Sequence, residues 1–215
     1  MGLKTMSFHG IFFGVEMESL RTYFDRHASS WDQMLNYHER TPELLKVVSW
    51  FRLTKGHWVL DVGTGTGILL PLIQNAIGPK GVLVGFDFSL KMIEKATLRE
   101  YFGGKFLLAA DAESIPLRSD LFDRVTCFSA FPHFSDKRKA LFEMVRVLKK
   151  GGFLFIAHLK SVEELNQLHQ TLGEPVSNDL LPPPQTLKKM MKDAGFMEIS
   201  IINQPGKFLA KGRKI

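Results

Sequence analysis

Hydrophobic and polar positions follow two different periods along most of this chain. Between residues 57 and 172, short apolar runs alternate with stretches in which apolar side chains recur every three or four residues. A short apolar run is typical of a buried strand, whereas the longer spacing is typical of an amphipathic helix. The pattern therefore predicts five strands, at residues 58–62, 82–86, 105–109, 122–128 and 153–158.

Helices are expected between these strands and after the last of them. Ser89 precedes one of them and is a suitable N-cap, and Gly151-Gly152 is expected to stop the helix before the fifth strand. The triplet Pro182-Pro183-Pro184 is expected to exclude regular structure. The expected helices cover residues 68–76, 89–101, 136–148, 163–172 and 187–194.

The end of the chain has the pattern of a β-hairpin. Two apolar runs, at 197–202 and 207–211, are separated by Pro205-Gly206, which suits a turn. Together with the alternating strands and helices, these runs predict an α/β fold, with a mostly parallel sheet covered by helices on both faces. Ligands of such sheets bind beyond the carboxyl ends of the strands.

The first fifty residues have a different character. Residues 1–16 show little periodicity and are expected to be a mobile leader, whereas residues 17–215 are expected to form a single domain. Helical spacing begins near Ser19 and continues in a second short segment from Trp31. A third helix is expected to open with Thr41 as its N-cap and Pro42 at its first position.

Composition places the chain among soluble proteins. Of its 215 residues 45% are hydrophobic and 23% are charged, and no apolar run approaches the roughly 20 residues that a membrane-spanning helix needs. The single cysteine, Cys127, cannot form an internal disulfide and is expected to be a buried small hydrophobe. With no clear secretory signal, a cytoplasmic location is expected.

The formal net charge is +6 and the pI is near 9.4, which permits binding to nucleic acid without requiring it. Part of this excess is local, because four basic residues and no acid occupy the last nine positions. We interpret them as a solvated tail in preference to an RNA or lipid patch. These residues are Lys207, Lys211, Arg213 and Lys214.

A glycine-rich segment follows the first predicted strand. Glycines at 63, 65 and 67 allow a sharp turn from strand to helix and leave backbone N–H groups open to a ligand. A dinucleotide site requires G-x-G-x-x-G, so the third glycine comes one residue early. A P-loop requires Lys and then Ser or Thr after its last glycine, whereas Ile68-Leu69 follows here. Neither phosphate-binding pattern fits.

Acidic residues at the ends of the first three strands indicate a different ligand. Asp61 would repel a pyrophosphate but attract an ammonium group. Asp87 ends the second strand, where an acid accepts hydrogen bonds from ribose hydroxyls. Asp111 would accept from the exocyclic amine of adenine, with Phe88 and Ala112 on the faces of the ring. A ligand with an amine, a ribose and an adenine but no phosphate is S-adenosylmethionine (SAM).

These motifs resemble the class I SAM-dependent methyltransferases, in particular the group that includes the menaquinone- and ubiquinone-type enzymes. The resemblance covers residues 57–158 in family order. The matching pieces are the V-L-D-x-G-x-G-x-G segment at 59–67, Asp87, the pair Asp111-Ala112, the segment 122–125 and the segment 146–152. Asp123, within the fourth piece, is expected to shape a turn and to have no chemical role.

The resemblance implies a Rossmann-like fold with strand order 3-2-1-4-5-7-6, strand seven being antiparallel. It also implies that residues 17–50 form a helical lid over SAM, and that the methyl group passes by direct displacement to a small-molecule acceptor, with S-adenosylhomocysteine as the other product. The expected cofactor-binding residues are Asp61, Gly63, Thr64, Gly65, Gly67, Asp87, Phe88, Ser89, Asp111, Ala112 and Ser129.

Candidate catalytic residues follow the fourth and fifth strands. His133 and His158 are candidates for a general base, since imidazole titrates near neutral pH. With His169 they are also candidates for a metal site, although the wide sequence separation argues against it and no metal is predicted. Residues 158–187 are expected to build the acceptor pocket.

Aromatic residues are frequent in the first forty positions. Most are expected to pack in the core or the lid, and one or two to contact the sulfonium through a cation–π interaction. They are Phe12, Phe13, Tyr23, Phe24, Trp31 and Tyr37. Two alternatives stay open: an RNA or protein methyltransferase, consistent with the basic pI, and a SAM-binding regulator without catalytic activity. The acceptor and the oligomeric state are left open.

Overall fold

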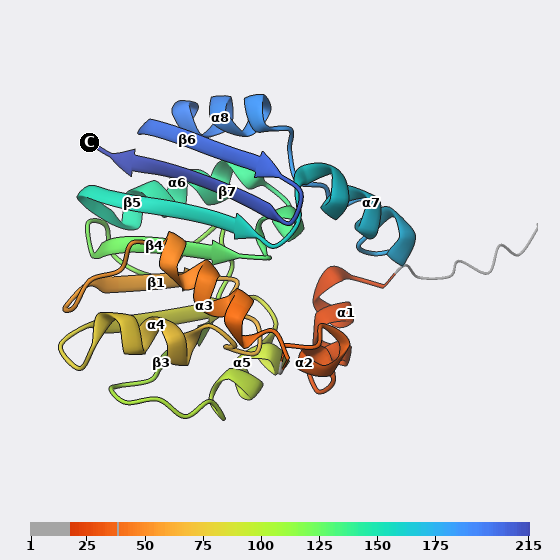
Figure 1. Ribbon diagram of the computed structural model, residues 1–215, viewed down its shortest axis with the longest axis horizontal. Coiled ribbons are helices and arrows are strands. Elements are labelled where there is room, and N and C mark those ends of the chain that lie inside the picture. The colour runs from red at the N-terminus through yellow and green to blue at the C-terminus, as the bar shows by residue number, and fades with distance from the viewer. Residues whose placement is uncertain (1–17, 38) are drawn as a thin grey trace, which may run out of the picture.

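Seven strands form one sheet in the order β3-β2-β1-β4-β5-β7-β6 (Figure 1), which confirms the expected order. β7 is antiparallel to β5 and β6, and the other neighbouring pairs are parallel. The computed structural model describes residues 18–37 and 39–215, so the expected leader with Phe12 and Phe13 lies outside the described residues. The strands are β1 Trp58–Val62, β2 Val82–Asp87, β3 Phe106–Ala109, β4 Phe122–Phe128, β5 Leu148–His158, β6 Phe196–Gln204 and β7 Lys207–Lys214.

Helices cover both faces of the sheet, as expected. α3 and α4 lie on one face, and α6 and α8 lie on the other (Figure 1). None of the described helices is long and apolar enough to cross a membrane. The helical segments are α1 Leu20–His27, α2 Trp31–Met34, α3 Thr41–Trp50, α4 Leu70–Ile77, α5 Leu90–Ala96, the 3-10 turn η1 Phe131–His133, α6 Lys137–Val147, α7 Val162–Leu172 and α8 Pro184–Asp193.

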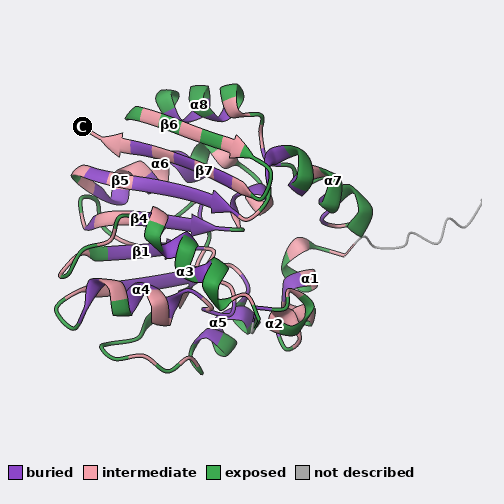
Figure 2. Cartoon of the chain, viewed as in Figure 1, coloured by how far each residue is buried: buried purple, intermediate pink, exposed green. Residues whose placement is uncertain are grey.

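The central strands bury side chains on both faces, because successive residues point to opposite sides of a strand. In β1, Val59 joins the core beneath α3 and α4, whereas Leu60 joins the core beneath α6 and α8. The same alternation places Phe155 of β5 in the first core and Ile156 in the second. Figure 2 shows this buried centre and the exposed outer faces of the helices. Cys127, in β4, is fully buried as predicted.

Several element boundaries differ from the sequence-based expectation, and four of these differences concern residues that were given a specific role. Gly151-Gly152 does not separate helix from strand: β5 starts at Leu148 and contains both glycines, with a register shift against β4. α8 starts at Pro184, because proline is tolerated in the first turn, where its missing N–H would have no helical partner. α5 ends at Ala96, well before residue 101. Thr41 lies inside α3 and is not its N-cap.

Two expectations about charged residues were wrong. Asp123 lies in β4 and not in a turn, and its carboxylate accepts from the Trp58 backbone N–H at 2.8 Å and from Lys149 Nζ at 2.9 Å. The basic residues near the C-terminus belong to β7, which is paired on both edges, and they are not a free tail. Lys214 Nζ, for example, donates to the backbone oxygens of Arg146 and Leu148.

Candidate functional site

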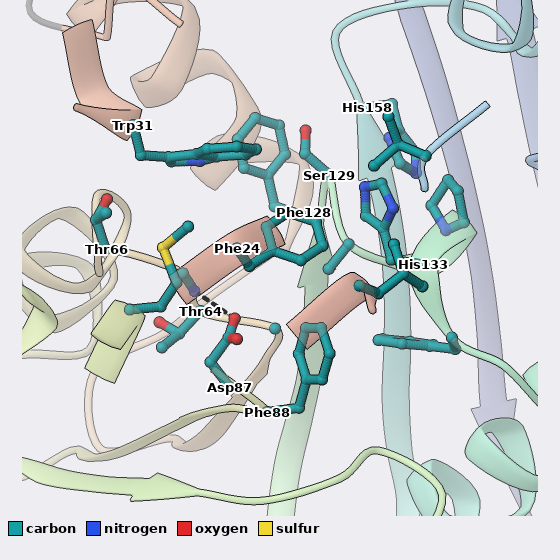
Figure 3. A pocket seen from close by; sticks show the side chains of 18 of the residues that line it. Phe24, Trp31, Thr64, Thr66, Asp87, Phe88, Phe128, Ser129, His133 and His158 are labelled. Carbon is teal, nitrogen blue, oxygen red and sulfur yellow. Dashed lines mark hydrogen bonds between the residues drawn. The ribbon is translucent and has the colours of Figure 1, made fainter. Parts of the chain in front are cut away.

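A cavity of about 280 Å³ opens beyond the carboxyl ends of β1, β2, β4 and β5. This is the place where open α/β sheets bind ligands. The α1–α2 segment forms one wall and α7 with the loop after it forms another. In Figure 3, Asp87, Thr64 and Thr66 lie on one side of the cavity and His133 and His158 on the other, with Phe24 and Phe128 between them.

The glycine-rich segment takes a backbone conformation that side chains disfavour. Gly63, Gly65 and Gly67 have φ values of +68°, +55° and +75°. A Cβ on Gly63 would lie 2.3 Å from Cβ of Ala130, whereas a Cβ on Gly65 would meet nothing within 4 Å. Gly63 therefore packs tightly against Ala130, whereas Gly65 faces open space on the cavity side. Gly67 packs against α5 and does not line the cavity.

Asp61 lies at the bottom of the cavity and is 3% exposed. Its carboxylate accepts from the hydroxyls of Thr64 at 2.8 Å and Thr126 at 2.7 Å. Burial raises the pKa of Asp61 to about 6, although both hydroxyls act in the opposite direction. Among the described residues no cationic side chain forms an ion pair with it, so the ionised form has unmatched negative charge.

Asp87 supplies a second buried carboxylate at the end of β2. It accepts from the backbone N–H of Gly65 and from that of Ser89, each at 2.9 Å. Burial raises the pKa of Asp87 to about 6, and those two N–H groups lower it. With Asp61 it makes this side of the cavity repel a phosphate and attract a ligand that carries hydroxyls and positive charge. These two hydrogen-bond acceptors fit the hydroxyls and the positive charge of SAM.

The structure brings most of the other expected cofactor residues to the same cavity. Thr64, Phe88, Asp111, Ala112 and Ser129 all line it. The Asp111 carboxylate also accepts from the Glu113 backbone N–H at 2.8 Å, so it shapes its own turn as well.

Ser89 is the exception among the polar residues. Its side chain is fully buried, does not line the cavity and caps α5 by accepting from the Met92 backbone N–H at 3.1 Å. It confirms the N-cap prediction, and its contact with the ligand side is indirect, through its backbone N–H to Asp87.

Two acids attach the N-terminal helices to the site, and neither was predicted from the sequence. Asp25 on α1 accepts from the Ser89 hydroxyl at 2.5 Å and from the Lys91 backbone N–H at 3.3 Å. Asp32 on α2 accepts from the Thr66 hydroxyl at 2.5 Å and forms an ion pair with the Arg99 guanidinium. The available signal was an acid beside an aromatic residue on each helix, which does not identify its partner.

Aromatic residues of this segment cover the cavity. Tyr23, Phe24, Trp31 and Tyr37 all line it. The Phe24 ring packs edge-on against Phe88 at 5.6 Å and against His133 at 5.0 Å, measured between ring centroids. One ring of α1 thus bridges the acidic side and the histidine side.

Three histidines converge at the far end. His133, His158 and His169 all line the cavity, and the rings of His133 and His169 stack with centroids 5.1 Å apart. His133 Nδ1 lies 2.7 Å from the carboxylate of Asp179, a residue that the sequence analysis did not single out. The three rings do not make a metal site: within residues 18–37 and 39–215 no group of His, Cys, Asp or Glu is arranged to hold an ion.

His158 stands out because it is 2% exposed and neither ring nitrogen has a partner among the described residues. Burial lowers the pKa of His158 to about 3, and charge on His133 and His169 acts in the same direction. The ring is therefore neutral at pH 7, with one N–H and one lone pair unused.

The comparisons with known proteins agree with this site. Residues 60–156, from β1 to β5, match a family model described as a methyltransferase domain. A ubiquinone/menaquinone biosynthesis C-methyltransferase UbiE of Vibrio vulnificus is 33% identical over 184 residues, covering 74% of this chain and 71% of the relative. The corresponding protein of Vibrio cholerae is 30% identical over the same length.

Solved structures share the fold. A SAM-dependent methyltransferase of Thermotoga maritima superimposes with a TM-score of 0.73 at 21% identity, covering 89% of this chain and 98% of that one. A phosphoethanolamine N-methyltransferase of Haemonchus contortus, bound to S-adenosylhomocysteine, has a TM-score of 0.71 at 20% identity. The match covers 87% of this chain and 46% of that one. The matched domain and the curated relatives show that this chain belongs to the class I SAM-dependent methyltransferases, with SAM as its cofactor.

Proposed function

We propose that this methyltransferase modifies a small, mostly apolar molecule that has a hydroxylated ring, and that it places the methyl group on a ring carbon. The observation that carries the proposal is the two-sided character of the cavity. The acids lie at one end, and the other end combines histidines and Lys160 with the apolar side chains of α7. The curated relatives are named as C-methyltransferases of quinone biosynthesis, which supports a ring acceptor.

The acidic end suits the cofactor. In the proposal Asp87 accepts from the ribose hydroxyls, and Asp111 accepts from the adenine amine with Phe88 and Ala112 on the ring faces. Asp61 is more deeply buried than Asp87, at 3% against 7% exposure, so it acts on the amino-acid end mainly through its charge. SAM supplies the methyl group and a neutral thioether leaving group. The protein aligns donor and acceptor, and such alignment is worth about 7–11 kcal/mol of barrier.

The opposite end suits the acceptor. Its walls come from Leu165, Leu168 and Leu172 of α7 and from Val176 in the loop after it. These side chains would bury a flat apolar ring, and burial of apolar area favours binding by about 25 cal/mol per Å². His158 is neutral there, which suits an uncharged acceptor better than a charged one. In this proposal residues 158–187 form the acceptor side, and the described part of the N-terminal segment, residues 18–37 and 39–50, forms the lid.

The test is transfer of labelled methyl from SAM to a panel of acceptors. The panel contains 1,4-naphthalenediol, its dimethyl ether, histamine, phosphoethanolamine and total tRNA. We expect label on a ring carbon of the diol, assigned by NMR of the product, and none on the ether. Label on tRNA alone would replace the proposal by the nucleic-acid alternative. Tight SAM binding with no label on any acceptor would favour the regulator.

A further inference from the structure

We propose that Asp179 positions His133 as the base that removes the proton from the acceptor hydroxyl. The proposal rests on the function proposed above and adds to it a named base, a positioning residue and the atom that takes the proton. Neither residue belongs to the cofactor end of the cavity. They come from segments far apart in the chain, η1 after β4 and the loop between α7 and α8.

The contact between the two residues has the geometry of a charge-assisted hydrogen bond. His133 Nδ1 lies 2.7 Å from Asp179 Oδ2, across 46 residues of sequence. Each side chain is 14% exposed, so water competes little for the bond. A carboxylate can only accept, and therefore Nδ1 carries the proton. In the neutral ring the lone pair is then on Nε2.

The loop that carries Asp179 is itself held in place. The backbone oxygen of Asp179 accepts from His169 Nδ1, and the His169 ring stacks on the His133 ring at an interplanar angle of 26°. Two residues further on, the backbone N–H and oxygen of Leu181 pair with the side chain of Asn166 at 2.8 and 3.0 Å. Asp179 thus fixes the Nδ1 edge of His133, and His169 of α7, held by the Asp179 backbone oxygen, covers one face of the ring.

The remaining edge of His133 carries Nε2, and the side chain lines the cavity. Phe24 packs edge-on against the ring from α1, and His158 lies beside it on the same side of the cavity (Figure 3). The buried His158 nitrogens have no partner among the described residues, and an unsatisfied buried polar group costs about 1–3 kcal/mol. An acceptor oxygen on this side of the cavity would meet the His133 lone pair.

The proton transfer balances without any further reactant. Nε2 of His133 takes the hydroxyl proton, and the O–H electron pair raises the electron density of the neighbouring ring carbon. That carbon forms its bond to the methyl group as the bond from methyl to sulfur breaks, and the sulfur keeps the electron pair. The proton on the methylated carbon then moves to the ring oxygen, and the proton on His133 leaves to water. One proton is released for each methyl group transferred.

Ring NMR tests the positioning claim directly, with or without an active acceptor. In the ¹⁵N-labelled protein bound to S-adenosylhomocysteine we expect His133 to carry its proton on Nδ1. In Asp179→Asn the amide can donate to Nδ1, so we expect the proton to move to Nε2. An Nε2–H form in the unmodified protein, or a spectrum unchanged by Asp179→Asn, would overturn the proposal.

Kinetics test the chemical role. With 1,4-naphthalenediol as acceptor, we expect His133→Gln and Asp179→Asn each to lower kcat by about 10²–10⁴-fold with little change in KM. Asp179→Glu should recover part of the loss, and Asp193→Asn, an exposed acid on α8, is the matched control. S-adenosylhomocysteine affinity should stay within about twofold in all variants. Full activity in folded Asp179→Asn would refute the pairing, whereas absence of methyl transfer to the diol by the unmodified protein would refute the proposed function and leave the NMR test of the pairing standing.

Discussion

Asp32 on α2 accepts a hydrogen bond from the hydroxyl of Thr66 at 2.5 Å, although the two residues lie 34 positions apart. Thr66 belongs to the glycine-rich segment, so this bond attaches the N-terminal helices to the loop that lines the cofactor end. Arg99 completes the contact, because its guanidinium pairs with Asp32 and its Nε donates to the Thr66 backbone oxygen at 3.0 Å. Docking of these helices and binding of the cofactor should therefore be coupled.

The first prediction concerns this coupling. Asp32→Ala should weaken S-adenosylhomocysteine binding by about 1–3 kcal/mol, the usual size of such a coupling, because the loop and the helices lose their shared contact. Calorimetry measures the affinity, and amide hydrogen exchange in α1 and α2 should become faster. Asp120→Asn, at an exposed acid that pairs with Lys214, is the control. Unchanged affinity and unchanged exchange in Asp32→Ala would show that the helices dock independently of the cofactor.

Much of the fold was predictable because local pattern and global fold agree. β1 and β4 have the predicted bounds, since their apolar runs are buried on both faces. The hairpin of β6 and β7 follows from Pro205-Gly206 between two runs. Gly151-Gly152 misled the prediction because the chain passes directly from α6 into β5, and the glycines lie inside the strand. Local propensity cannot tell a strand irregularity from a helix stop.

The residues of the candidate site were likewise predictable only in part. Asp61 and Asp87 were found because strand ends and the glycine-rich segment carry a local signal. Asp25, Asp32 and Asp179 were missed because their roles depend on partners 64, 34 and 46 residues away. An acid in a helix or loop is usually solvated, and only the packing of distant segments shows that these three are not.

A second prediction concerns the ribose contact. Asp87→Ala should cost about 1–3 kcal/mol of SAM affinity, because ribose hydroxyls would be left without an acceptor. Asp87→Asn should lose less, since it keeps one oxygen and the shape of the side chain. Calorimetry on both variants, with circular dichroism to confirm folding, gives the measurement. A folded Asp87→Ala protein with unaltered affinity would remove this residue from the site.

A third prediction follows from the raised pKa values of Asp61 and Asp87, both about 6. Above pH 6 both carboxyls lose their protons and attract a cationic ligand, so SAM affinity should increase from pH 5 to pH 7.5. Asp87→Asn should flatten this dependence. Calorimetry across the range measures it. An affinity that is constant, or that falls as the pH rises, would be incompatible with two buried carboxylates at the site.

A fourth prediction concerns stability and His158. Its pKa in the folded protein is lowered from 6.5 to about 3, so the unfolded chain binds the proton more readily. The contribution of His158 to the free energy of unfolding is therefore fully present above pH 6.5. It decreases as the pH falls toward 3. His158→Gln removes this dependence. Urea unfolding at pH 7.5 and pH 5 should show that lowering the pH costs the unmodified protein more than the variant. The opposite order would mean that His158 is charged when folded.

A fifth prediction separates two glycines that share a left-handed backbone. Gly63→Ala and Gly65→Ala both introduce strain of about 1–3 kcal/mol, but only the first adds a contact of 2.3 Å, with Cβ of Ala130. Gly63→Ala should therefore unfold at the lower urea concentration. Gly65→Ala should keep more stability yet bind SAM more weakly, since its new methyl group enters open space at the cavity. Equal stabilities would contradict the tight packing of Gly63.

A crystal structure with S-adenosylhomocysteine would show directly how the cofactor lies in the cavity. We expect the ribose hydroxyls on the Asp87 carboxylate, the adenine amine near Asp111, and the sulfur directed toward the end of the cavity that holds His133 and His158. A nucleoside bound outside this cavity, or bound in it with its ribose away from Asp87, would contradict the account.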